Sequence, residues 1–239
     1  MSETRAEAEP AKADPGVSRR ELAVARSLDS ARARAESRLQ RFLDAALELM
    51  TEGEPHKDFT VQEVVERSGQ SLRLFYQYFG GKHELLLALF EETVRSCTEI
   101  IRGKIADEDD ALERLHCFVV EYYRLCRPAP GGDPAEWTPV APMLVDFAQQ
   151  LLTRHPTEAA QAFVPLVSLF SEVLDAAAAA RSIRSGLRHS TIAGMMLEAM
   201  MFNTFSATIG GMSLRAETAD PAEEFWDLIL HGVGATSPS

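Results

Sequence analysis

The chain has 239 residues, of which 46% are hydrophobic and 25% charged, and its formal net charge at pH 7 is -12. A chain of this length can hold a small domain and a larger one with its own core. Its start, MSETRAEAEPAKADPG, lacks the apolar segment of a signal peptide or anchor, and no later stretch approaches about eighteen uncharged apolar residues. We therefore expect a cytoplasmic protein without a membrane span.

The N-terminal region is rich in arginine. These side chains could follow DNA phosphates or enter a minor groove. The alternative is a solvated tail in which Glu21, Asp29 and Glu36 balance their charge. Up to and including Lys82 the chain has 13 basic and 14 acidic residues, against 11 and 22 after it, so the acidic excess lies in the second part. The arginines concerned are Arg19, Arg20, Arg26, Arg32, Arg34, Arg38 and Arg41.

A first amphipathic helix is predicted from apolar residues at helical spacing, and it should run for about twenty residues and end near Gly53 and Pro55. Its inward face consists of Leu39, Phe42, Leu43, Ala46, Leu47 and Met50.

Residues 59–82 show the pattern of two short helices joined at a glycine. Thr60 followed by Glu63 predicts a capping box at the start of the first short helix, and Gly69 ends that helix. Ser71 is the expected N-cap of the second short helix. Two short helices followed by a longer one are the arrangement that lays a helix in the DNA major groove.

The second short helix is expected to have one buried stripe, formed by Leu72, Phe75 and Phe79. The opposite face would be left for a partner, and its side chains suit phosphates and base edges. Gly80 and Gly81 should end the helix just before Lys82. The side chains on this exposed face are Arg73, Leu74, Tyr76 and Gln77.

These residues resemble the helix-turn-helix of the tetracycline-repressor-like (TetR) family of transcription regulators. The resemblance covers roughly fifty residues, from Leu39 to Leu86, which is the size of a helix-turn-helix domain. Three positions depart from the family pattern: Gln70 replaces an apolar residue, Leu74 replaces a hydroxyl, and Gly81 replaces a capping Ser or Asn. The residues that carry the resemblance are Ser68, Gly69, Gln70, Ser71, Leu72, Arg73, Leu74, Phe75, Tyr76, Gln77, Tyr78, Phe79, Lys82, Leu85 and Leu86.

The resemblance implies an operator-binding protein that dimerises through its C-terminal helices and holds an effector in its second domain. We expect Tyr76 and Lys82 to contact phosphates, and Arg73 and Gln77 to contact base edges. The full set expected at the DNA is Thr60, Gln70, Ser71, Leu72, Arg73, Leu74, Tyr76, Gln77, Tyr78 and Lys82.

The rest of the chain also reads as helical, and strand signals are missing. The fourth helix should begin at Lys82 and carry Leu86, Phe90, Val94, Cys97 and Ile101 on one side. Further helices are expected at about 109–126, 143–152, 157–181 and 186–209, with a last one opened by Asp220 and Pro221. The predicted fold is all-α, with a flexible extension (1–30), a three-helix DNA-binding domain (31–82), an effector-binding and dimerisation domain (83–232) and a tail (233–239).

The segment 186–209 is apolar nearly all round, so it must be covered on more than one side. It is either a subunit interface or the middle of a core. A two-fold homodimer is expected, because two recognition helices then reach successive turns of the major groove. The partner helix in the interface would be 157–181 or the last helix, around Phe225, Trp226 and Ile229.

An effector pocket for a small apolar molecule is expected among helices five to eight, although each residue taken singly is better explained by core packing. The candidates are Phe118, Tyr122, Met143, Phe147, Leu151, Phe163, Met196, Met200 and Asn203, with His116 and Tyr123 as further polar groups.

No catalytic or metal-binding pattern is found, and no cofactor is expected. The cysteines Cys97, Cys117 and Cys126 lack C-x-x-C spacing, and His83-Glu84 lacks the second histidine of a zinc-protease helix. The predicted function is a DNA-binding repressor that a small apolar ligand releases from its operator. The alternative is an all-α interaction or regulatory module that no longer binds DNA.

Overall fold

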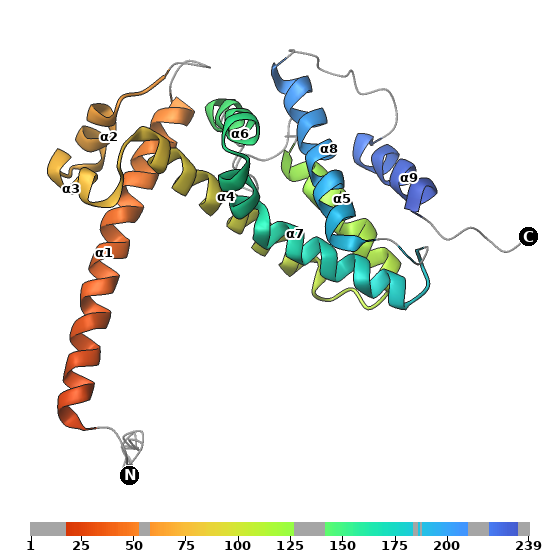
Figure 1. Ribbon diagram of the computed structural model, residues 1–239, viewed down its shortest axis with the longest axis horizontal. Coiled ribbons are helices and arrows are strands. Elements are labelled where there is room, and N and C mark those ends of the chain that lie inside the picture. Colours follow the sequence, from red (N-terminus) through yellow and green to blue (C-terminus); the bar gives the residue numbers. More distant parts are fainter. Residues whose placement is uncertain are drawn as a thin grey trace, which may run out of the picture.

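The computed structural model describes residues 18–52, 58–126, 142–183, 186, 188–209 and 220–233. Within these ranges the fold is built from helices in two groups, a small N-terminal group and a larger C-terminal one (Figure 1). The helices are α1 (Arg19–Glu52), α2 (Val61–Ser68), α3 (Leu72–Tyr78), α4 (Lys82–Ile105), α5 (Ala111–Cys126), α6 (Pro142–Arg154), α7 (Pro156–Ala179), α8 (His189–Ile209) and α9 (Pro221–Val233). The all-α prediction is confirmed.

The first helix is longer than predicted. Helix α1 has 34 residues, and its N-terminal half projects from the body of the protein as a single arm (Figure 1). The arm has no buried stripe and therefore gave no periodic signal, but it is rich in Ala and Arg, which are strong helix formers. The i,i+4 pair of Arg32 and Glu36, 2.7 Å apart, adds to its helicity. The C-terminal half buries Phe42, Leu43 and Ala46, as predicted.

Helix α4 joins the two groups. It begins at Lys82, as predicted, and contacts α1 on one side and α5, α6 and α7 on the other. Its buried residues include Leu86, Phe90, Val94 and Ile101, which confirms the predicted stripe, whereas Cys97 is half-buried. One continuous helix, which begins shortly after the end of α3, therefore reaches into the core of the second domain.

Helix α7 is the centre of the second domain and contacts α4, α5, α6 and α8. By length and apolar composition alone it could cross a membrane. Its apolar side is accounted for by packing, because Leu166, Phe170 and Leu174 are buried in the core. Phe170 stacks on Phe118 of α5 with ring centroids 4.3 Å apart.

Local hydrogen bonds place the helix ends of the second domain. Helix α5 begins after Asp110, whose Oδ1 accepts from the backbone N–H of Leu112 at 2.8 Å and of Glu113 at 3.0 Å. Helix α7 ends at Ala179, before the predicted Arg181, because Arg181 adopts a left-handed conformation (φ 61°). Helix α8 begins at His189, three residues after the predicted start.

Candidate nucleic-acid interface

The start of α2 is fixed by a capping box, as predicted. The Thr60 hydroxyl accepts a hydrogen bond from the Glu63 backbone N–H at 3.3 Å, and the Glu63 carboxylate accepts from the Thr60 backbone N–H at 2.7 Å. Val64 and Val65 are buried on the inner face of the helix. The hydroxyl of Thr60 is thus engaged within the protein.

The turn between α2 and α3 depends on Gly69. Its φ of 66° lies in the left-handed region, and a Cβ at this position would meet no atom within 4 Å. Glycine is therefore required by the backbone conformation and not by lack of space. The Gln70 backbone N–H donates to the Val65 carbonyl at 3.3 Å, which closes the turn. Ser71 then caps α3, because its Oγ accepts from the Leu74 backbone N–H at 3.2 Å.

Aromatic packing fixes the orientation of α3 on α1. The rings of Phe42 and Phe75 meet edge to face with centroids 5.5 Å apart, and Phe79 lies 6.2 Å from Phe42 and 5.3 Å from Phe75. All three rings are buried. Because rings at this spacing pack in preferred geometries, they hold the short α3 at one angle to α1.

The opposite face of α3 is open to solvent. Arg73, Tyr76 and Gln77 are exposed, and the side chain of Tyr76 is 57% accessible. Leu74 and Tyr78 are half-buried.

The predicted burial of Leu72 is wrong, because this residue is 42% accessible. Helix α3 ends at Tyr78 and Phe79 has extended backbone angles (φ -134°, ψ 133°). The burial of Phe79 therefore does not follow from helical spacing, and the i,i+7 argument that placed Leu72 on the same stripe does not apply.

Besides Thr60 and Ser71, two further residues expected at the DNA are held by the protein itself. The Gln70 side chain donates from Nε2 to the carbonyl oxygen of Arg38 at 2.7 Å. The Lys82 ammonium donates to the Asp58 carboxylate and to the carbonyl oxygen of Phe59 at 2.5 Å, and it lies 4.1 Å above the Phe59 ring. These bonds brace the N-terminal group of helices, and DNA contact by these residues stays a prediction.

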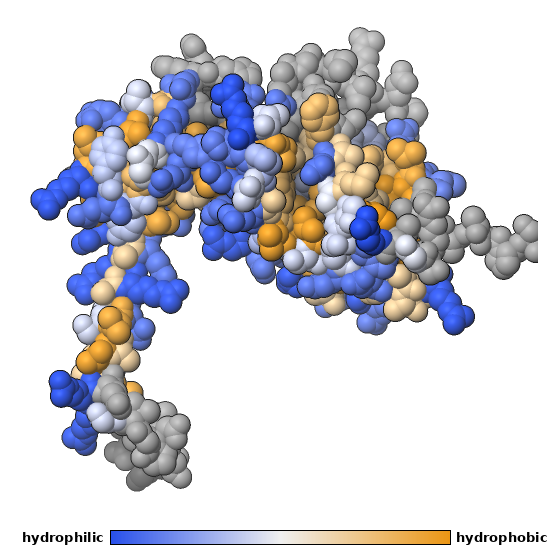
Figure 2. Space-filling model, viewed as in Figure 1, coloured by the Kyte–Doolittle hydropathy of each residue, from blue (hydrophilic) through white to orange (hydrophobic). Residues whose placement is uncertain are grey.

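The arginines of α1 form a pattern that sequence reasoning missed. At about 100° per residue, six of the seven fall within an arc of about 120° of the helix surface. Arg32 lies on the opposite side, where it pairs with Glu36. All seven are exposed, and hydrophilic side chains run along the arm in Figure 2. A helical projection of residues 19–41 would have revealed the stripe. We name it the arginine stripe: Arg19, Arg20, Arg26, Arg34, Arg38 and Arg41.

The predicted pocket residues separate into two groups. Phe118, Tyr122, Phe147, Leu151 and Met200 are buried, whereas Phe163 and Met196 are half-buried. The side chains of Met143 and Asn203 lie outside the described residues. Burial raises the pKa of Tyr122 well above its ordinary value, so its phenol stays neutral.

A groove of about 400 Å³ lies between α7 and α8, and among the predicted pocket residues whose side chains are described Phe163 lines it. This volume is within the range of small-molecule sites. The lining is mainly apolar and includes Leu152, Ala159, Val164, Val167, Leu197 and Met201.

Large apolar side chains are also exposed on the helices of the second domain, including the two that border this groove. Met195 and Phe202 on α8 are each 66% accessible, and Val164 on α7 is also exposed. Trp226 and Ile229, which were candidates for a subunit interface, are buried within the chain, where α9 packs on α5. Leu228 is the large apolar residue that α9 turns outward.

Comparisons with known proteins agree with this architecture. Residues 42–89 match the model of "Bacterial regulatory proteins, tetR family". No curated protein matches the chain.

Several solved structures are similar to the whole fold. The fatty acid degradation regulator FadR from Bacillus halodurans aligns with a TM-score of 0.60 at 17% identity, over 80% of this chain and 94% of that one. FadR from Bacillus subtilis in complex with stearoyl-CoA gives 0.59 at 17% identity, over 81% and 98%. A TetR family regulator from Marinobacter aquaeolei VT8 gives 0.55 at 18% identity, over 86% and 100%. At these identities the likeness shows a common fold.

Proposed function

We propose that the chain is a cytoplasmic repressor of the TetR type that a small apolar ligand releases from its operator, because residues 42–89 match the tetR-family model and the helices have the arrangement of the similar solved structures. In this proposal it acts as a homodimer. The alternative of a module that no longer binds DNA does not explain why the outward face of α3 carries Arg73, Tyr76 and Gln77.

The exposed face of α3 is the observation that carries the proposal. Buried aromatic rings and the cap formed by Ser71 hold the helix in place, so its outward side chains are positioned before DNA arrives. Arg73 can donate two hydrogen bonds to guanine, and Gln77 can pair with adenine. Tyr76 is suited to a phosphate, and the exposed Leu72 offers apolar contact to a thymine methyl group.

The arginine stripe supports a second contact with DNA. Arg38 lies beside the turn that precedes α3, since its carbonyl oxygen accepts the Gln70 hydrogen bond. From there the stripe continues along the projecting arm, away from the body of the protein (Figure 1). Six cations on one helix face match the regular charge of a phosphate backbone. We propose that the arm follows the duplex beyond the base pairs that α3 reads.

Dimerisation is supported by the exposed apolar surface of α7, α8 and α9. Met195 and Phe202 are seven residues apart and therefore lie on one face of α8, and Val164 on the neighbouring helix α7 is exposed as well. Large apolar side chains left exposed on packed helices are typical of an interaction site. A second copy of the chain is the proposed occupant, because α3 has only 7 residues and one copy reads few base pairs.

The effector is proposed to be apolar and elongated. The groove between α7 and α8 is lined mainly by apolar side chains, and Phe163 joins it to the core around Phe90, whose ring is 5.4 Å away. The Bacillus subtilis FadR structure was solved with stearoyl-CoA. A long-chain acyl compound is therefore the first ligand class to test.

A genomic binding-site selection with the purified protein tests the DNA-binding function. We expect short two-fold symmetric sites whose half-sites lie about 34–36 Å apart. Arg73→Ala should relax the preference at one position of each half-site. Arg95→Ala is the matched control, because Arg95 is an exposed arginine on α4 that pairs with Glu92 at 2.5 Å. A wild-type protein that selects no sequence would favour the interaction-module alternative.

A further inference from the structure

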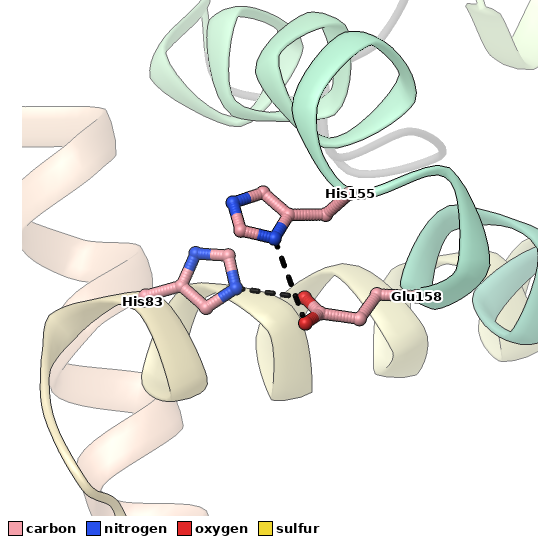
Figure 3. Close-up of side chains that lie close together, drawn as sticks. All are labelled: His83, His155 and Glu158. Carbon is pink, nitrogen blue, oxygen red and sulfur yellow. Dashed lines mark hydrogen bonds and ion pairs between the residues drawn. The ribbon is translucent and has the colours of Figure 1, made fainter.

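Two histidines and a glutamate meet where the DNA-binding domain joins the second domain. His83 is the second residue of α4, His155 precedes α7, and Glu158 lies in the first turn of α7. The three ligand atoms lie within 4.8 Å of one another. Figure 3 shows both imidazole rings turned toward the carboxylate of Glu158.

The contacts within this group have the geometry of a ligand set. His83 Nε2 lies 2.8 Å from Oε2 of Glu158, and His155 Nδ1 lies 3.7 Å from Oε1. Ligand atoms in a tetrahedral zinc site are about 3.3 Å apart, since metal–ligand bonds are about 2.0–2.1 Å. The two observed distances bracket this value, so small side-chain rotations would open a position for an ion.

We propose that His83, His155 and Glu158 bind one divalent transition-metal ion, for which Zn²⁺ is the reference. Two imidazoles and one carboxylate are a borderline donor set that suits Zn²⁺ and its neighbours. Each imidazole would present a lone pair to the ion and keep its proton on the other ring nitrogen. Three protein ligands leave a fourth position for water.

The surroundings provide access and rigidity. His83 borders an open hollow of about 370 Å³ that also touches Asp146 and Gln150, so an ion and its water can enter. The buried ring of Phe147, 5.5 Å from the His83 ring, supports it from one side. The ammonium of Lys82 is already paired with Asp58, which offsets its repulsion of a cation.

The backbone at the start of α7 fixes the other two ligands. The His155 N–H donates to the Leu151 carbonyl at 2.8 Å, and its carbonyl accepts from Ala159 at 3.0 Å. Pro156 restricts the first position of the helix. His155 and Glu158 are therefore held three residues apart on rigid backbone.

An ion here would join α4 to α7 directly. Helix α4 follows the recognition helix, so the ion would hold the DNA-binding domain at one angle to the second domain. Any resulting change in operator affinity rests on the proposed function. Metal binding itself does not, and it can be measured without DNA.

Isothermal titration calorimetry with Zn²⁺, on untagged protein stripped with a chelator, tests the proposal, and Co²⁺ absorption gives the coordination geometry. We expect one ion per chain at micromolar or tighter affinity. His83→Asn, His155→Asn and Glu158→Gln should each weaken binding at least about tenfold. Asn is a good N-cap, so His155→Asn keeps the start of α7, and circular dichroism of all variants checks folding.

His116→Asn is the matched control. His116 also lies close to a carboxylate, with its Nε2 2.7 Å from Glu223. Its second acidic neighbour, Glu113, faces the other ring nitrogen, Nδ1, so the three residues cannot bind one ion together. Binding of Zn²⁺ by the thiol of Cys97 is disfavoured, because burial raises the pKa of that thiol to about 11. The proposal fails if the wild type binds no stoichiometric ion, or if the three variants bind as tightly as the wild type. The residues would then form only ion pairs.

Discussion

The side-chain amide of Gln70 donates a hydrogen bond from Nε2 to the carbonyl oxygen of Arg38, 2.7 Å away. This bond ties the turn of the helix-turn-helix to α1, at the place where the arginine stripe passes the start of α3. In the TetR resemblance this position is apolar, so the chain replaces apolar packing at the turn with a polar bond. The relationship gives Gln70 a structural role that does not require DNA.

Gln70→Ala should therefore lower stability without changing the DNA sequence that is preferred. A lost hydrogen bond of this kind reduces the free energy of unfolding by about 1 kcal/mol. Urea denaturation measures the loss, and binding-site selection measures the preference. Gln70→Leu, which restores an apolar residue, should recover part of the stability. An altered base preference in either variant would place Gln70 at the DNA.

Lys82 and Asp58 should affect DNA affinity in opposite directions. Lys82→Ala removes a cation beside the recognition helix and should weaken binding to every sequence, whereas Asp58→Asn releases the same cation and should strengthen it. Fluorescence anisotropy on two unrelated duplexes measures both effects. If Lys82→Ala leaves affinity for every duplex unchanged, the residue only braces Asp58 and Phe59.

Removing arginines from the arginine stripe should reduce the salt dependence of DNA affinity. Each phosphate contact that is lost should reduce the slope of log affinity against log salt by about 0.9. Arg26→Gln combined with Arg34→Gln removes two members of the stripe. Arg32→Gln is the control, since Arg32 points away from the stripe and pairs with Glu36. Equal slopes for the wild type and the double variant would show that the arm does not touch DNA.

The sequence predicted those features whose cause is local. The capping box of Thr60 and Glu63, the break at Gly69 and the start of α4 at Lys82 all follow from short-range hydrogen bonds and backbone preferences. Apolar spacing also located the stripe of α4. Leu72 was misplaced because α3 ends at Tyr78 and Phe79 is extended, so the helical spacing assumed between Leu72 and Phe79 does not hold.

Features that depend on distant residues could not be predicted. Helical spacing does not distinguish a pocket from a core, so Phe118 and Phe163 carried the same signal, yet only Phe163 lines the groove. His83 and Glu158 are 75 residues apart, and only the packing of α4 on α7 brings them together. The arm of α1 has no buried face, so apolar spacing did not predict its length.

Substitutions at Phe202 and Met200 should distinguish a loss of dimerisation from a loss of folding. Phe202 is exposed in the single chain, so Phe202→Asp should give a folded monomer, whereas Met200 is fully buried and Met200→Asp should unfold the chain. Light scattering gives the oligomeric state, and circular dichroism checks the fold. Leu28→Asp, at an exposed apolar residue of the arm, should leave the dimer intact. A wild-type monomer at micromolar concentration would contradict the proposed dimer.

The contact of Phe90 with Phe163 provides a path from the groove to α4. Phe163 lines the groove, and its ring meets that of Phe90 edge to face at 5.4 Å. Phe147 is a second aromatic neighbour of Phe90, with ring centroids 6.5 Å apart. A ligand that displaces Phe163 would therefore press on α4, whose first residue adjoins the recognition segment. Movement of this rigid helix would change the spacing of two recognition helices in a dimer.

Phe90→Leu should weaken this coupling while leaving ligand binding in place. The measurement is the dissociation constant of stearoyl-CoA with and without saturating operator DNA. Linkage requires that DNA lower the affinity for the ligand by the same factor by which the ligand lowers the affinity for DNA, typically about 5–150-fold. We expect a smaller factor in Phe90→Leu, because the shorter side chain transmits less of the displacement. Equal dissociation constants for the wild type with and without DNA would mean that the groove is not linked to DNA binding for this ligand.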